Sequence, residues 1–257
     1  MNVDVLLQQF PQFLLVYVLL LVVIAIAKLC GINQSKMVIV SSMKMTVQLI
    51  LAGFVLTAIF DNPHFVYLLA YLLVMVAFAV HRVISKNPGL NRRFKWVIAL
   101  SMAFCGGCVL VFFVGCVVRK KLNDPQYMIP IFGMLMGNAM TAVGLGVKTF
   151  RESLSGHRDQ INALLCFGAS PRKILLPFAR QAMETAMLPT LNSMAGMGIV
   201  ALPGMMTGQI LSGTLPFTAI LYQISIMVAI CTTVTGASFG VLYFGYHTLY
   251  DSKTQIL

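Results

Sequence analysis

The sequence predicts an all-α, polytopic helical membrane protein with about seven transmembrane helices. Of its 257 residues, 59% are hydrophobic and only 10% are charged, and the mean hydropathy is +0.88. A soluble domain of this length needs far more charge to cover its surface. The charge-free stretches 5–27, 62–81, 96–118 and 125–147 each supply the roughly 20 residues that cross a hydrocarbon core. A fifth stretch, 185–250, has room for two crossings and a turn.

Basic residues between the spans predict the orientation of the chain. The segments 28–37, 81–96 and 148–185 and the tail 246–257 hold 14 of the 18 Lys and Arg residues. Because cytoplasmic loops carry an excess of basic residues, we expect an outside N-terminus and an inside C-terminus, with the cluster Arg119-Lys120-Lys121 as the exception. If the first span is absent from the bundle, six helices remain and the same loops lie on the cytoplasmic side. The expected spans, in one domain over residues 1–257, are 10–27, 38–60, 65–80, 97–118, 128–147, 186–208 and 217–245.

The net charge of +11 does not indicate a nucleic-acid partner here. In a membrane protein, basic loops orient the helices, and we expect the lipid bilayer rather than nucleic acid to be the relevant partner. Cys105 and Cys108 fall inside an apolar span without a second Cys or His pair nearby. We interpret them as small apolar side chains rather than as a zinc or redox site.

The segment 148–185 is the largest element expected outside the membrane, on the cytoplasmic side. Residues 157–167 can form an amphipathic helix, and Gly168 suits the end of that helix because glycine tolerates a left-handed backbone. Ser170 and Pro171 then supply a hydroxyl cap and a proline at the first position of another helix. The sequence therefore predicts a helix, a tight break and a second helix.

Polar residues inside the spans are the candidates for a transport path, because an unpartnered polar group in hydrocarbon costs several kcal/mol. Such residues also commonly bond neighbouring helices, and methionines commonly only pack, so both readings stay open. Lys44 has a further alternative, since its ammonium can reach the cytoplasmic interface. In 202–209, a proline and a glycine should interrupt the helix and expose backbone groups. The candidate path residues are Lys44, Gln48, Met134, Asn138, Thr141, Asn192, Met205, Met206 and Gln209.

Catalytic motifs are scarce in this chain. A P-loop needs a Gly-Lys dipeptide, which does not occur, so we do not expect an enzyme with its own ATPase motif, or a cofactor in this chain. Residues 236–240 match G-x-S-x-G, but they lie in an apolar helical span rather than at a strand-to-helix turn. Small-residue packing is the simpler interpretation for this motif and for the G-x-x-x-G pairs 133/137, 204/208 and 236/240, within the chain or between two copies of it.

Four stretches together resemble one known family. They are SSMKMTVQLILAGFVL (41–56), GMLMGNAMTAVGLG (133–146), FGASPRK (167–173) and LPTLNSMAGMGIVALPGMMTGQILSG (188–213). The chain from about residue 41 is similar to the FetB-like permeases, bacterial membrane subunits of an ABC-type iron exporter that are related to plant aluminium-tolerance permeases.

This resemblance implies a homodimeric permease that works with a separate cytoplasmic ABC ATPase, which supplies the P-loop and uses the ATP. It places the ATPase-coupling segment over 148–185, with the contact at Gly168, Ala169, Ser170, Pro171, Arg172 and Lys173. The break is also similar to the importer loop pattern Glu-Ala-Ala, three residues, Gly, although Asn162-Ala163-Leu164 replaces the acidic start.

The leading hypothesis is therefore an ABC-type export permease of the plasma (inner) membrane, crossing it several times and carrying iron or another metal ion or complex. Iron favours carboxylate, imidazole and thiolate ligands. Asp, Glu and His residues do not lie clearly within the expected spans, so we expect no tight metal site and only weak contacts along the path. One alternative is a membrane sensor or scaffold that transports nothing and binds a partner through its basic loop. Another is an intramembrane enzyme that uses Ser238.

Overall fold

The computed structural model describes residues 3–31, 35–62, 64–119 and 123–249, with side chains from residue 16 onward. Within these ranges the chain is helical, and its β-structure is limited to one isolated bridge between Met197 and Ala201. Two compact units divide the chain, residues 1–62 and residues 63–257. The expectation of one domain over residues 1–257 stays a prediction.

The first unit is a pair of helices, α1 (Val3–Leu29) and α2 (Ser35–Asp61). The hydroxyl groups of Tyr17 on α1 and Thr46 on α2 form a hydrogen bond, which joins the two helices between their apolar surfaces. Most side chains of α2 are exposed within this unit, although the helix is strongly apolar. A lipid environment or other protein surface is what such a helix requires.

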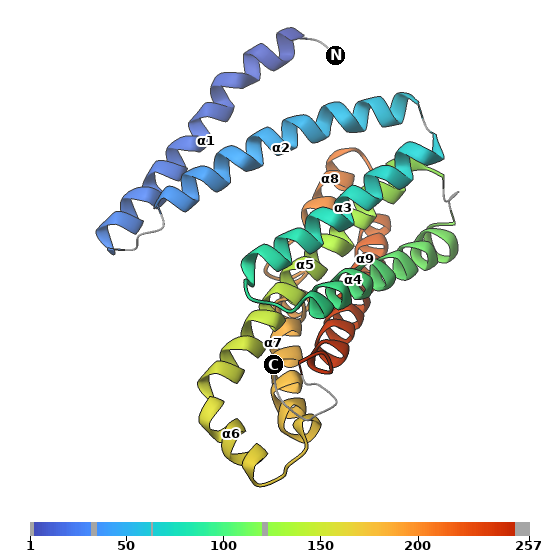
Figure 1. Ribbon diagram of the computed structural model, residues 1–257. Coiled ribbons are helices and arrows are strands. Elements are labelled where there is room, and N and C mark those ends of the chain that lie inside the picture. Colours follow the sequence, from blue (N-terminus) through green and yellow to red (C-terminus); the bar gives the residue numbers. More distant parts are fainter. Residues whose placement is uncertain (1–2, 32–34, 63, 120–122, 250–257) are drawn as a thin grey trace. The chain divides into compact units, whose positions relative to one another are not determined.

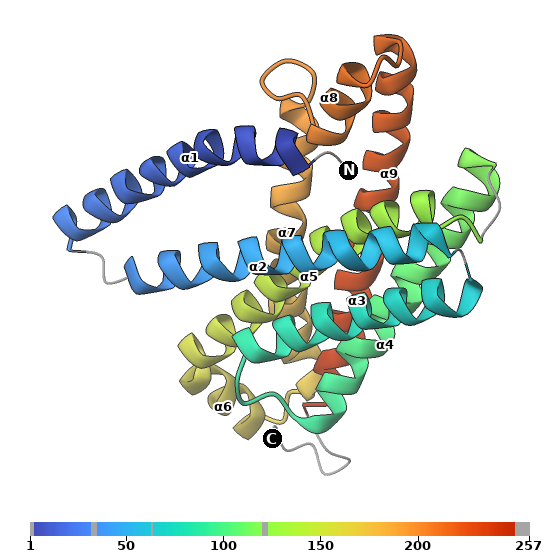
Figure 2. The ribbon, with the colours of Figure 1, turned by 90° about the horizontal axis from the view of Figure 1, so that it is seen from above.

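The second unit is a bundle organised around one long helix, α5, which packs against α3, α4, α7 and α9 (Figure 1). At one end of the bundle lies α6, and at the opposite end lies α8, as the two views agree (Figure 2). Two short π-helical segments, η1 and η2, extend α4 and α9. The bounds are α3 (Phe65–Lys86), α4 (Arg92–Phe112), η1 (Phe113–Val118), α5 (Pro125–Gly156), α6 (Arg158–Cys166), α7 (Pro171–Gly196), α8 (Gly204–Leu211), α9 (Pro216–Phe239) and η2 (Gly240–Phe244).

Local sequence explains why α5 begins where it does and why it is central. The Asp124 side chain accepts a hydrogen bond of 3.1 Å from the main-chain N–H of Gln126, and Pro125 occupies the first turn, where no N–H is needed. The buried residues of α5 are apolar, and from Ala139 onward they include small ones such as Ala142 and Gly146. Small side chains let neighbouring helices approach closely, which is how membrane helices gain packing energy.

The predicted all-α membrane fold is confirmed. Five helical stretches in the described ranges are long and apolar enough to cross a bilayer, and each covers or overlaps an expected span. They are Ser35–Asp61, Phe65–Lys86, Arg92–Val118, Pro125–Gly156 and Pro216–Phe244. The stretch Val16–Leu29 of α1 is a shorter apolar helix at the place of the first expected span.

The structure differs from the expectation at 186–208, which is not one helix. Instead, α7 starts already at Pro171 and ends at Gly196, and a non-helical segment precedes α8. Gly198 has a φ of +85°, a left-handed conformation that glycine adopts at little cost, and Pro203 precedes the first residue of α8. The predicted interruption therefore starts several residues before the Pro203-Gly204 pair.

The crossing of α9 and η2 over α4 depends on glycines. A Cβ placed on Gly236 would lie 3.2 Å from the Cys105 sulfur, and one on Gly240 would lie 2.9 Å from the Cβ of Ser101. Gly236 and Gly240 therefore let α4 pack closely against α9 and η2 of the same chain. The packing role that the sequence predicted for this pair is confirmed. Gly204 and Gly208 have no atoms of other residues within 4 Å of such a Cβ.

We predict that Gly240→Ala destabilises the bundle by about 1–3 kcal/mol, because the added methyl group collides with the Ser101 side chain, which is fixed to α4. Gly107→Ala is the matched control, since its Cβ would meet nothing within 4 Å and alanine favours the helix. Thermal unfolding of the purified protein in detergent measures both effects. An equal melting temperature for the two variants would contradict the close-packing account.

Candidate functional site

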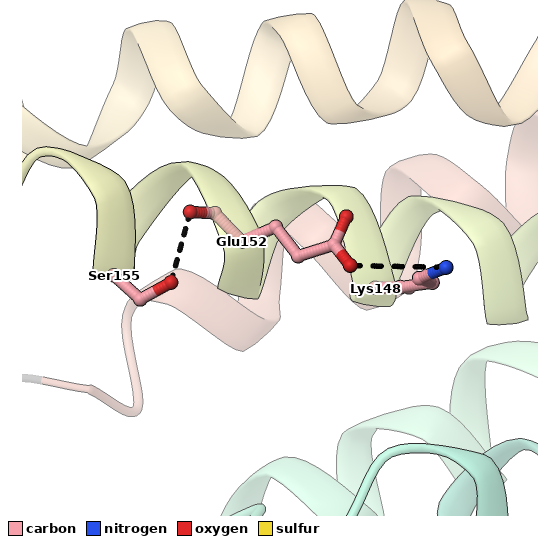
Figure 3. Close-up of polar contacts among 3 residues, drawn as sticks. All are labelled: Lys148, Glu152 and Ser155. Carbon is pink, nitrogen blue, oxygen red and sulfur yellow. Dashed lines mark hydrogen bonds and ion pairs between the residues drawn. The ribbon is translucent and has the colours of Figure 1, made fainter.

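The first candidate site is the helical segment expected on the cytoplasmic side. The helix α5 continues past the charge-free stretch and becomes polar: Lys148 and Glu152 form an exposed ion pair of 3.7 Å, and Ser155 donates a 3.0 Å bond to the Glu152 carbonyl (Figure 3). An exposed pair of this kind adds little stability. It lies in the part of α5 that carries charged side chains, whereas residues 125–147 carry none.

The break between α6 and α7 has the geometry that the sequence predicted. Gly168 has a φ of +81°, its N–H bonds the Leu165 carbonyl, and the Ala169 N–H bonds the Leu164 carbonyl, which closes the end of α6. Pro171 opens α7. One detail was wrong: the Ser170 side chain makes no capping bond, although its backbone occupies the cap position.

An exposed surface surrounds this break. Phe167 is 88% exposed, and Gly168, Ser170, Arg172 and Lys173 are exposed as well. An exposed aromatic side chain and two exposed cations thus lie within seven residues of one another in the sequence. Ala169 is half-buried and Pro171 is buried, so these two hold the break against the helices.

Arg172 links the first turn of α7 to the chain's C-terminal aromatic cluster, Tyr243, Tyr246 and His247. The pKa of Arg172 is raised, chiefly by side-chain hydrogen bonding to Tyr246 and also by Tyr243. The Tyr246 hydroxyl is buried, and among the described residues it has no partner at full hydrogen-bond geometry, so its contact with Arg172 is a loose one. The Tyr246 ring is fully buried and stacks on the His247 ring, with 4.2 Å between the ring centroids.

The second group of candidates lies on α5. Asn138 and Thr141 are both exposed in the isolated chain, one turn apart on a transmembrane helix. The Asn138 side chain donates a 2.8 Å bond to the carbonyl of Met134, and the Thr141 hydroxyl donates a 3.1 Å bond to that of Gly137. Each side chain therefore satisfies one donor within its own helix, and both residues are exposed, so the Asn138 oxygen and the Thr141 hydroxyl oxygen can still accept hydrogen bonds.

The other candidates lie on three further helices. Asn192 is exposed on α7, and Met205 and Gln209 are half-buried on α8, whose Met206 is buried where α8 packs on α9. Lys44 and Gln48 are exposed one turn apart on α2, in the first unit.

Three buried polar residues in α9, Gln223, Thr233 and Ser238, were not among the sequence-derived candidates for the path. Gln223 is 7% exposed, and its amide nitrogen approaches the sulfur of Met197 at 3.9 Å, while its oxygen is unpaired within the described ranges. A glutamine within the uncharged run 185–250 was the signal that could have found it. Ser238, the serine of G-x-S-x-G, is completely buried in α9. That position suits helix packing and leaves no open surface for a substrate.

Acidic, histidine and cysteine side chains do not gather into a metal site in the part of the chain that the structure describes. The candidate path residues on α5, α7 and α8 carry amide, hydroxyl and thioether groups. Such ligands bind weakly in comparison with thiolates or imidazoles.

The fold and its surfaces define a multi-pass α-helical membrane protein. It belongs to the uncharacterised protein family UPF0014, whose profile matches residues 10–250. The UPF0014 membrane protein slr1647 of Synechocystis sp. is 31% identical over 239 residues, 91% of each chain. The "Probable iron export permease protein FetB" of Escherichia coli is 31% identical over 217 residues, 82% of this chain and 80% of the relative. "Protein ALUMINUM SENSITIVE 3" of Arabidopsis thaliana is 30% identical over 246 residues, 96% and 88% of the two chains. No solved structure matches this chain.

We predict that acidification weakens the aromatic cluster around Arg172. The pKa of His247 is lowered from 6.5, first by burial and then by the charge of Arg172. The folded state therefore takes up a proton less readily than the unfolded state. This contribution to stability is full above the unfolded pKa and is lost as the pH falls through the folded pKa.

The melting temperature should accordingly fall more for the wild type than for His247→Gln between about pH 7.5 and about pH 5, the range in which histidine titrates. Tyr243→Phe is the control, because it removes a neighbouring hydroxyl and leaves the imidazole in place. Identical pH profiles for the wild type and His247→Gln would contradict the assignment.

Proposed function

We propose that this protein is the membrane-spanning permease subunit of an ABC-type transporter, which exports iron or another metal ion or complex. A separate cytoplasmic ABC ATPase supplies the energy, and the site of action is the plasma (inner) membrane. One observation carries the proposal: the exposed α6–break–α7 segment at one end of a transmembrane bundle, in a chain similar over most of its length to a protein named as a probable iron export permease.

The break is suited to docking a second protein. The exposed ring of Phe167 can fill a pocket on a partner, and Arg172 and Lys173 add positive charge beside it. Buried aromatic anchors with charged surroundings are typical of the residues that dominate protein interfaces. We infer that Gly168, Ala169, Ser170, Pro171, Arg172 and Lys173 form the contact with the ATPase.

The helices on either side of the break give a route for the movement. The helices α5 and α7 both run without interruption from the α6 end into the bundle. They pack closely at Gly146, where an added Cβ would lie 3.1 Å from the Cβ of Ala186. Arg172 also contacts Tyr246, which follows η2. Displacement of the break would thus be transmitted to α5, α7 and α9 together, because packed helices move as rigid elements.

A second copy of the chain would complete the path. Gly137, Asn138 and Thr141 form an exposed small and polar surface within a transmembrane span of α5. Hydrocarbon cannot satisfy the outward polar atoms, whereas a partner helix or a water-filled path can. We infer that two copies face each other through this surface and that cargo passes along it, with weak contacts that allow release.

The first test is co-purification with the ATPase. We expect the tagged protein, expressed with its neighbouring genes, to retain a P-loop ATPase in detergent and to drive ATP-dependent metal flux in proteoliposomes. A protein that never retains an ATPase would refute the coupling, and a reconstituted complex without metal flux would favour the sensor or scaffold hypothesis.

Variants of the break sharpen this test. Gly168→Trp cannot easily adopt the positive φ of Gly168, and Arg172→Glu places a negative charge beside Tyr246, so both should insert normally but lose ATP-driven flux. Gln160→Glu, an exposed change on α6, is the control for altered charge. Normal flux in both break variants would show that the coupling contact lies elsewhere.

We predict that Asn138→Leu and Thr141→Val slow flux about fivefold or more, the effect of losing roughly one hydrogen bond of 1 kcal/mol to the moving cargo. Thr232→Val on α9 is a matched control, since that exposed threonine makes the same kind of bond, 2.9 Å to the carbonyl four residues earlier. Flux and thermal unfolding are measured on all three variants. Equal flux in Thr141→Val and Thr232→Val would exclude the α5 surface from the path.

A further inference from the structure

Gln223 is a polar side chain enclosed by the bundle near the α8 end. It lies in the second turn of α9, within a transmembrane span, and only 7% of its surface is exposed. Its carboxamide oxygen has no hydrogen-bond partner in residues 3–31, 35–62, 64–119 or 123–249. A buried, unsatisfied amide group costs about 1–3 kcal/mol, which an apolar residue of similar shape would not. The fold alone therefore does not account for a glutamine here.

The neighbour of Gln223 points to a ligand. Its amide nitrogen contacts the thioether sulfur of Met197 at 3.9 Å, and sulfur is a weak acceptor. Met197 is the first residue after α7, at the start of the non-helical segment 197–203, where main-chain carbonyls are released from helical bonding. The Gln223 carboxamide thus lies next to the residue at which α7 ends and the non-helical segment begins.

Two further thioethers are buried on the helices that meet at this end of the bundle. Met206 is the buried residue of α8, which packs on α9, and Met227 is buried one turn after Gln223 on the same face of α9. Carboxamide oxygen, carbonyl oxygen and thioether sulfur form a neutral set of donors. Thioether ligands favour soft and borderline transition metals, whereas Mg²⁺ and Ca²⁺ prefer an all-oxygen set rich in carboxylates.

We propose that Gln223 and Met197 form a binding contact for a transition-metal cation at the α8 end of the bundle. The cation approaches past the non-helical segment 197–203, the Gln223 oxygen and the Met197 sulfur donate electron pairs to it, and no group is oxidised or reduced. This proposal rests on the proposed function, which it deepens by naming a cargo contact. Because the donors are uncharged, binding is weak and the cation can leave again.

Binding is tested on the purified full chain in lipid nanodiscs with methionine methyl groups labelled with ¹³C. Fe²⁺ is titrated without oxygen, and Mg²⁺ is titrated in parallel. We expect Fe²⁺, and not Mg²⁺, to broaden the Met197 methyl signal, which is assigned by its loss in Met197→Leu. In Gln223→Leu, the midpoint of the Fe²⁺ titration should rise about tenfold, which corresponds to about 1.4 kcal/mol.

Stability separates a cargo contact from a structural role. Since the Gln223 oxygen has no partner within the described ranges, Gln223→Leu should keep or raise the melting temperature while it weakens binding. Thr233→Val is the control, because the Thr233 hydroxyl is buried on α9 and already bonded, at 2.9 Å, to the Ala229 carbonyl. Unchanged Fe²⁺ binding in Gln223→Leu would overturn the proposal, with or without a fall in melting temperature.

A third variant covers the case in which Gln223→Leu loses both stability and binding. Gln223→Met restores a donor atom of similar reach, so it should recover Fe²⁺ binding, and failure to recover it would overturn the proposal. ATP-driven flux of the wild type is measured separately. If the wild type shows no flux but Fe²⁺ binding depends on Gln223, the proposed function is refuted and the binding site is supported. If flux is normal but Fe²⁺ binding does not depend on Gln223, the binding site is refuted and the proposed function is supported.

Discussion

The need to satisfy polar groups inside a bilayer governs this protein more than any other constraint. Helices meet it for the main chain, and the hydroxyl and amide side chains on them meet it locally: Thr141, Ser193 and Thr232 each bond a carbonyl four residues earlier. Once these local bonds are removed from consideration, few polar groups are left over. Among the described residues, the buried oxygens of Gln223, Ser238 and Tyr246 have no hydrogen-bond partner. A polar group left unpaired within a membrane span is a candidate for contact with a solute.

Close helix packing is the second consequence of a lipid environment, because water does not drive the helices together there. Glycine and alanine therefore stand where α5 meets α7 and where α9 meets α4. Gly146, Gly236 and Gly240 all lie where an added Cβ would approach a neighbouring helix within 3.4 Å. This tight core surrounds α5 and continues to the contact between Arg172 and the aromatic residues after η2, so the polar end and the transmembrane part of the second unit are mechanically continuous.

The sequence predicted the helix–break–helix segment well because its signals are local. A glycine that can adopt a positive φ, followed by a proline at a first helical turn, specifies the geometry almost independently of the rest of the chain. The interruption of 186–208 was predicted less well. Its position depends on how α8 packs on α9, and Pro189, which could have ended α7, is accommodated inside it. Gln223 escaped notice because burial and pairing are properties of contacts between distant residues.

Composition and the spacing of charges by themselves predicted that this chain is helical, that it inhabits a membrane and where five of its long apolar helices lie. Hydrocarbon tolerates so few charges that their absence over about 20 residues is decisive. Tertiary structure alone decided which polar side chains are buried without partners, which glycines touch another helix and that Arg172 meets Tyr246. These facts depend on residues far apart in sequence being brought together, and hydropathy, which is a sum over neighbours along the chain, contains no information about such pairs.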